Sequence, residues 1–175
     1  MTNRLKQFFR AFTAKIVSDD LKFVKAWLND NECVLFFNMS IIDQKHCINV
    51  AHTAEALATG LNVDMGLLIK VALLHDCGRK NGDLGITGKS FTVIFDKVFG
   101  YEFFLLLNFL SELRWFSRIY RLIEVYYQHS ERSASELTKI NCSAESVKIV
   151  LSHHKPATGT DCIELRLLKQ ADSMN

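Results

Sequence analysis

One helix-length stretch of the sequence, residues 64–77, constrains the fold more than any other. Its residues are apolar on almost every side of a helix, a pattern typical of a helix buried at the centre of a domain. The stretch ends abruptly in His75 and Asp76, an imidazole and a carboxylate side by side. Because burying polar groups costs free energy unless they are paired, these two residues predict a polar centre inside the molecule.

The rest of the chain follows helical patterns as well. Strand-like alternation is scarce, Phe is abundant and there is a single proline, so we expect a mostly helical, all-α protein. Helices are expected over 3–17, 20–29, 41–59, 64–77, 101–113, 116–139, 144–154 and 162–173. Gly60 and Gly78 resemble helix ends. Ser143 is the expected N-cap of the 144–154 helix, and Asp161 with Glu164 resembles a capping box before the last helix.

Composition limits the domain organisation and the class of partner. With 175 residues, 49% of them hydrophobic, the chain is predicted to form one domain over 1–175, with its core over 41–173 and N-terminal helices from 1–40 packed on it. A net charge of +2, without a basic stripe among aromatic residues, argues against a nucleic-acid polymer as partner. Five scattered cysteines without a CxxC spacing favour reduced thiols and a cytoplasmic location.

Two segments bear on membrane association. The most apolar stretch, residues 103–110, is too short to span a bilayer. Residues 1–16 are basic and amphipathic, so this segment either packs its apolar face on the domain or lies on a membrane surface. We therefore expect no membrane span.

Five of the predicted helices carry His or Asp on an otherwise apolar face. Residues three, four or seven apart share a helix face, which places the following side chains inward: His46, His75, Asp76, His129, His153 and Asp172. Convergence on a metal centre explains all of them together, and imidazole with carboxylate suits Fe, Mn, Zn, Co or Ni. His52 lies six residues from His46, about 120° round the helix, so we expect it at the surface or behind the ligands.

This arrangement resembles the HD domain superfamily of metal-dependent phosphohydrolases, in which an H…HD…D pattern is carried on the helices of an all-α bundle. The matching residues are His46 in QKHCINVAHTA, His75 and Asp76 in LLHDCGRK, and Asp172 in LLKQADSMN. The resemblance covers roughly residues 41–173 and implies that these four residues bind one metal ion.

Two histidine segments extend the resemblance to one branch of the superfamily. QHSERSASELTKI and VLSHHKP are similar to segments of HD-GYP and YqeK-like hydrolases, which implies a second ion held by His129 and His153 and bridged by Asp76. HHKPATGTDCIE replaces the GYP signature, so the HDIG and YqeK-like branch is favoured and cyclic-di-GMP hydrolysis is not expected. Ile42 stands where trinuclear members carry a glutamate, so no third ion is expected. His154 matches the second histidine of the HD-GYP pair and is expected to bind substrate.

The resemblance implies hydrolysis of a small phosphate ester or anhydride, with a nucleotide as the favoured substrate. One or two divalent transition-metal ions, with Fe or Mn favoured over Zn, Co and Ni, would lower the pKa of the attacking water. Asp76 and Arg79 are the expected catalytic residues, and Lys80 joins His154 as an expected substrate-binding residue. Solvated surface is the alternative for the two basic residues.

Two other functions stay open. One is an HD-fold di-iron oxygenase, which uses nearly the same ligands for O₂ chemistry. The other is a non-catalytic sensor or regulatory domain that keeps the metal site for signalling or structure. A homodimer is also left open.

Overall fold

The structure, a computed structural model, describes residues 15–79 and 116–175, and over 116–127 it describes the backbone alone. Every regular element in these ranges is a helix, which confirms the all-α prediction. The helices are α2 (Ser18–Trp27), α3 (Asp30–Phe37), α4 (Ile41–Ala58), α5 (Met65–Leu74), α7 (Phe116–Lys139), α8 (Ala144–Ser152) and α9 (Ile163–Met174). Three predictions fall outside the described residues: the helix at 101–113, nearly all of the helix at 3–17, and the role of Lys80. Residues 15–17, the described end of the predicted 3–17 helix, are not helical.

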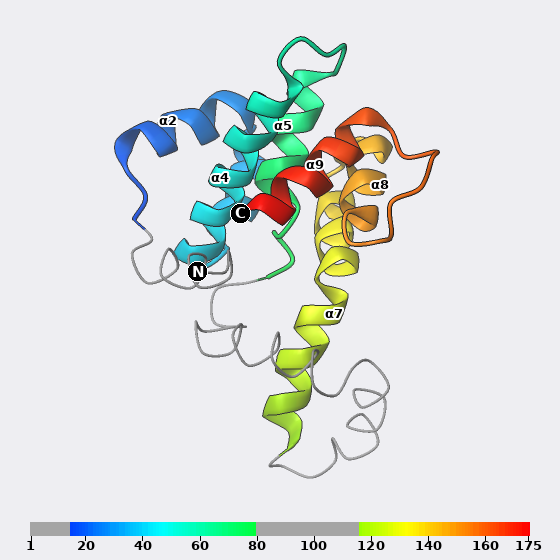
Figure 1. The fold of residues 1–175 in the computed structure, drawn as a ribbon. Coiled ribbons are helices and arrows are strands. Elements are labelled where there is room, and N and C mark those ends of the chain that lie inside the picture. The colour runs from blue at the N-terminus through cyan, green and yellow to red at the C-terminus, as the bar shows by residue number, and fades with distance from the viewer. Residues whose placement is uncertain (1–14, 80–115) are drawn as a thin grey trace, which may run out of the picture.

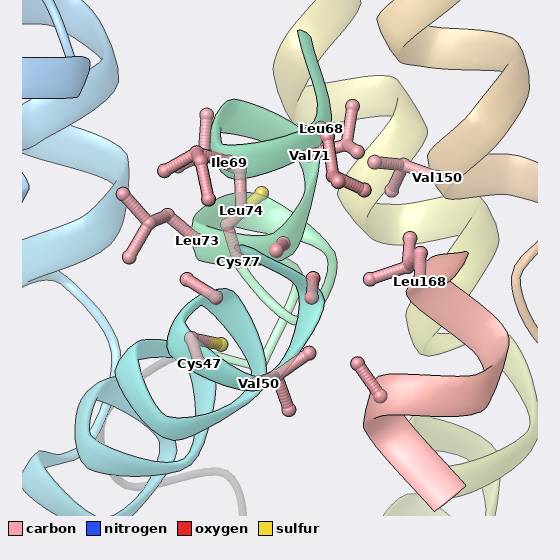
Figure 2. Close-up of a cluster of buried hydrophobic side chains, with 14 of the residues drawn as sticks. Cys47, Val50, Leu68, Ile69, Val71, Leu73, Leu74, Cys77, Val150 and Leu168 are labelled. Carbon is pink, nitrogen blue, oxygen red and sulfur yellow. The ribbon is translucent and has the colours of Figure 1, made fainter. Parts of the chain in front are cut away.

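Helix α5 lies at the centre of the bundle, as its apolar sequence predicts. It packs against α4, α8 and α9, and against the N-terminal helices α2 and α3 (Figure 1). Leu68 and Val71 point toward Val150 of α8 and Leu168 of α9, whereas Leu73 points away from them (Figure 2). All five of these side chains are fully buried. A helix that is apolar all round needs neighbours on every side, and this bundle supplies them.

Two helices that carry site residues follow the predicted boundaries closely: α7 has the predicted bounds, and α4 ends one residue earlier than predicted. Helix α4 begins after Ser40, whose side chain accepts a hydrogen bond from the backbone N–H of Asp43. It ends before Gly60, where a φ of 78° favours glycine. Helix α7 covers Phe116–Lys139, and in Figure 1 its first turns lead away from the other described helices. Its C-terminal half packs against α8, which begins after the predicted N-cap Ser143.

Helix α5 ends three residues earlier than predicted. The helix stops at Leu74 rather than at 77, and residues 75–78 continue as a turn. The backbone N–H of Gly78 donates to Ser133 Oγ of α7 at 2.8 Å. A Cβ at position 78 would lie 2.5 Å from the backbone nitrogen of Ser133, so the chain after α5 touches the α7 backbone here. This contact sets the direction of the turn that carries His75 and Asp76.

The N-terminal region contains a helix that the sequence interpretation missed. The helix expected over 20–29 is α2, which covers Ser18–Trp27, and α3 follows it where no helix was expected. The side chain of Asn29 accepts from the N–H of Glu32, and Glu32 Oε2 accepts from the N–H of Asn29. This reciprocal capping box starts a new helix, and its Asn-x-x-Glu spacing was visible in the sequence.

The predicted capping box at the last helix is wrong. Helix α9 begins after Cys162, without a side-chain cap. The carboxylate of Asp161 instead accepts from Lys169 Nζ at 2.7 Å and from the Thr158 hydroxyl at 2.6 Å. Glu164 accepts from the backbone N–H of Asp64. Both carboxylates are therefore used to tie α9 to neighbouring segments.

Two further observations concern the cysteines and the membrane. All five cysteines fall within the described ranges and are free thiols. Among the helices of residues 15–79 and 116–175, none combines the length and the apolar character needed to cross a bilayer.

Candidate metal centre

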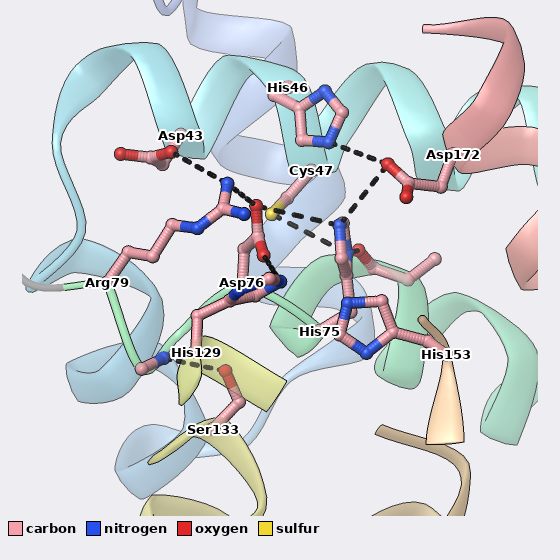
Figure 3. A network of polar contacts seen from close by, with 12 residues as sticks. Asp43, His46, Cys47, His75, Asp76, Arg79, His129, Ser133, His153 and Asp172 are labelled. Carbon is pink, nitrogen blue, oxygen red and sulfur yellow. Dashed lines mark hydrogen bonds and ion pairs between the residues drawn. The ribbon is translucent and has the colours of Figure 1, made fainter. Parts of the chain in front are cut away.

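The six side chains predicted as metal ligands lie together where five elements of the bundle meet. His46 comes from α4, His129 from α7 and Asp172 from α9, while His75 with Asp76 and His153 directly follow α5 and α8 (Figure 3). Their ring and carboxylate atoms face one another in the interior, with Asp76 in the middle. Residues up to 126 positions apart in the sequence are thus brought into contact.

Two histidines are oriented by the helix ends that precede them. His75 and His153 are the C-cap residues of α5 and α8. The Nδ1 of His75 lies 2.9 Å from the carbonyl of Ala72, and the Nδ1 of His153 lies 2.5 Å from the carbonyl of Val150. A carbonyl only accepts, so each Nδ1 carries the proton and each neutral ring keeps a lone pair on Nε2. This is the arrangement by which proteins orient metal-binding histidines.

The first group of candidate ligands consists of His46, His75 and Asp76. One ligand atom from each residue lies within 4.8 Å of the others. Asp172 adjoins this group, with its Oδ1 3.0 Å from His46 Nε2 and 3.7 Å from His75 Nε2. Asp172 therefore contacts both imidazoles of the first group.

The second group consists of Asp76, His129, His153 and His154, whose ligand atoms also lie within 4.8 Å of one another. The Nε2 of His129 lies 3.5 Å from Asp76 Oδ1. Three of the four residues are buried, and His154 is the exposed member. Asp76 is therefore common to both groups of candidate ligands.

The electrostatics of the cluster favour charged carboxylates and neutral imidazoles. Burial opposes ionisation of Asp76, but Arg79 and the neighbouring histidines hold its pKa well below the usual range. Burial opposes ionisation of Asp172 too, yet a histidine hydrogen bond keeps its pKa low. Burial lowers the pKa of His129 well below its usual range and that of His153 to about 3. These are the protonation states in which both residue types bind metals.

The comparisons with known proteins agree with this geometry. The family model described as the HD domain matches residues 44–175. The chain belongs to the HD domain family. Proteins of this family are in general metal-dependent hydrolases, but the match does not distinguish the HDIG and YqeK-like branch from others. No curated protein and no solved structure matches the chain.

The residues of this HD domain fit a divalent metal. Three buried atoms of the cluster have no hydrogen-bond partner among the described residues, namely His75 Nε2, Asp76 Oδ1 and His153 Nε2. Buried polar atoms without partners are costly, and cations held by the two ligand groups would serve these three atoms. The donor set of imidazole nitrogens and carboxylate oxygens suits a transition-metal ion.

Of the two basic residues predicted at the site, Arg79 for catalysis and Lys80 for substrate binding, the structure describes Arg79. The Nη1 of Arg79 lies 2.6 Å from Asp76 Oδ2, and its side chain is 15% exposed. The guanidinium therefore contacts the central carboxylate of the HD domain directly. Lys80 lies outside the described residues.

His52 lies outside both ligand groups. It is exposed on α4, its Nδ1 lies 3.7 Å from Glu55 Oε2, and its ring centroid lies 4.2 Å from that of Phe23. This agrees with the sequence argument that His52 and His46 point in different directions.

Three residues that support the centre were not singled out from the sequence. Asp43 lies beside Arg79, the Sγ of Cys47 lies 3.8 Å from His75 Nδ1, and the hydroxyl of Ser133 holds Gly78. Asp43 and Cys47 flank His46, and Ser133 follows His129 by one helical turn. Their short sequence separation from the predicted ligands His46 and His129 was the one signal in the sequence that pointed to these three residues.

Proposed function

We propose that this HD domain is a phosphohydrolase that cleaves a small phosphate ester or anhydride, with a nucleotide as the preferred substrate. The observation that carries the proposal is the pair of ligand groups that share the buried Asp76. Two-metal sites of this kind recur in enzymes of phosphoryl transfer. The family match supports metal-dependent hydrolysis as the general reaction.

We assign the ligands as follows. His46, His75, Asp76 and Asp172 hold one ion, and Asp76, His129 and His153 hold the second. Divalent ions bound there supply an activated water as nucleophile and positive charge for the phosphoryl oxygens. Fe or Mn is preferred, with Zn, Co and Ni as other ions that suit the same ligands.

The protein contributes the orientation of the ligands and their protonation states. The backbone carbonyls of Ala72 and Val150 fix the tautomers of His75 and His153, which keeps both Nε2 atoms available. Burial keeps the ring of His153 neutral, because its pKa is lowered to about 3. His153 therefore stays available as a ligand throughout the physiological pH range.

His154 is proposed to face the substrate. It is the exposed member of the second ligand group, so its ring can be reached from solvent. Its ring centroid lies 4.5 Å from that of His129 and 4.1 Å from that of His153. Arg79, three residues after Asp76, and Lys80, the next residue in the sequence, are proposed to offset charge on the phosphoryl oxygens.

A screen of phosphate esters and nucleotides in ¹⁸O-labelled water tests the proposal. Protein loaded with Mn²⁺, Fe²⁺, Co²⁺, Ni²⁺ or Zn²⁺ should release product that carries a single ¹⁸O on the phosphorus attacked by water. Asp76→Ala should abolish turnover, whereas His52→Ala serves as a matched control and should retain it. Failure to turn over any phosphate compound, together with O₂ consumption by the Fe-loaded protein, would favour the oxygenase alternative. Metal binding without either reaction would favour the sensor.

A further inference from the structure

The guanidinium of Arg79 lies between two carboxylates. On one side, Nη1 lies 2.6 Å from Oδ2 of Asp76. On the other side, the same Nη1 lies 3.9 Å from Oδ1 of Asp43 (Figure 3). The side chain is only 15% exposed, so both negative charges act on it with little screening by solvent.

Asp43 is a fixed partner in this arrangement. It lies in the first turn of α4 and its side chain is 2% exposed. The hydroxyl of Ser40 donates to Asp43 Oδ2 at 2.5 Å. The N-cap residue of α4 thus fixes the carboxylate of Asp43, which lies three residues before His46.

The two oxygens of Asp76 are unequal because of Arg79. Oδ2, which lies 3.8 Å from His75 Nε2, already accepts the Arg79 hydrogen bond. Oδ1, which lies 3.5 Å from His129 Nε2, accepts no hydrogen bond from the described residues. A cation beside His75 therefore shares its carboxylate oxygen with a guanidinium.

We infer that Asp43 is a positioning residue for the metal centre and that it acts on Asp76 through Arg79. The inference rests on the proposed function, because it assumes that Asp76 binds metal. Asp43 shares the positive charge of Arg79 and limits how strongly the guanidinium holds Asp76 Oδ2. Without Asp43, Asp76 is the nearest of the carboxylates that remain around Arg79, and the guanidinium competes more strongly with a metal for that oxygen.

A double-mutant cycle on metal affinity tests the inference without reference to activity. Isothermal titration with Mn²⁺ is carried out on the wild type, Asp43→Asn, Arg79→Gln and the double variant. Loss of an outer partner of a metal ligand typically weakens affinity by about 10–100-fold, and we expect a loss in this range for Asp43→Asn. In the Arg79→Gln background the same change should weaken affinity by less than about threefold, because the residue through which Asp43 acts is gone.

The cycle separates this inference from simpler explanations. A plain electrostatic effect of the Asp43 charge on the ions predicts the same loss in both backgrounds, and that result would overturn the inference, as would no loss at all. Glu32→Gln is the matched control, since Glu32 is equally buried but pairs with Lys70, and it should leave Mn²⁺ affinity unchanged.

Two further results have defined meanings. If circular dichroism shows that Asp43→Asn does not fold, Asp43→Glu takes its place in the cycle and must show the same dependence on Arg79. If the wild type binds none of Mn²⁺, Fe²⁺, Co²⁺, Ni²⁺ and Zn²⁺, the proposed function fails together with the inference. If it binds Mn²⁺ but the two residues are not coupled, the inference alone fails.

Discussion

The contact between the turn after α5 and helix α7 can be tested by adding a single methyl group. A Cβ at Gly78 would lie 2.5 Å from the backbone nitrogen of Ser133 and 2.8 Å from the carbonyl carbon of Arg132, whereas ordinary contact begins at 3.4 Å. The obstacle is backbone, which cannot rotate aside. In Gly78→Ala the turn and the helix must therefore separate by roughly 1 Å, an overpacking that costs about 1–3 kcal/mol.

The same displacement affects the metal centre. Asp76 lies two residues before Gly78, and His129 lies one turn before Ser133 on α7. Metal–ligand distances tolerate deviations of only about 0.2 Å, so a shift of roughly 1 Å should pull these two ligands apart. We expect Gly78→Ala to lower the free energy of unfolding by about 1–3 kcal/mol and to lose the second ion before the first.

Urea denaturation and Mn²⁺ titration measure the two effects. Gly159→Ala is the matched control, because nothing lies within 4 Å of the added Cβ. This change should leave stability unchanged or raise it by about 0.4–1 kcal/mol through the unfolded chain. A Gly78→Ala protein with wild-type stability and two bound ions would refute the argument that close backbone approach builds the site.

Three further predictions follow from individual contacts. Ser133→Ala leaves the buried N–H of Gly78 without its acceptor and should destabilise the fold by about 1–3 kcal/mol in urea denaturation; no change would show that water replaces the hydroxyl. The metal-free protein should lose stability as pH falls from about 6.5 toward 3, because His153 binds a proton in the unfolded state over this range but stays neutral in the folded state, where its pKa is about 3. His153→Gln should flatten this part of the profile of unfolding free energy against pH. His46→Ala should remove the first ion whereas His52→Ala should keep both, and elemental analysis with the reverse outcome would contradict the ligand assignment.

The sequence predicted the positions of the ligands better than the ends of the helices. The apolar surroundings of His46 and Asp172 place them inward on helices whose bounds were nearly right. The end of α5 was misplaced because residues 75–77 continue the helical pattern, while the contact of Gly78 with Ser133 belongs to tertiary structure. Sequence periodicity carries no information on such a contact.

The supporting residues were harder to predict. In the sequence, Asp43 looks like an ordinary acidic residue in the first turn of a helix. Its contact with Arg79 depends on the tertiary structure. Asp161 was read as a helix cap by its spacing, but Lys169, eight residues further on, binds its carboxylate instead. A side chain with two compatible partners cannot be assigned from local sequence alone.

The most direct test of the account is the number of metal ions that the protein binds. Elemental analysis of protein reconstituted with Mn²⁺ and freed of unbound metal should find two ions per chain for the wild type. Asp76→Ala should lose both, because this carboxylate is common to the two ligand groups. A wild-type protein that binds none of Mn²⁺, Fe²⁺, Co²⁺, Ni²⁺ and Zn²⁺, or an Asp76→Ala variant that keeps two ions, would contradict the central claim.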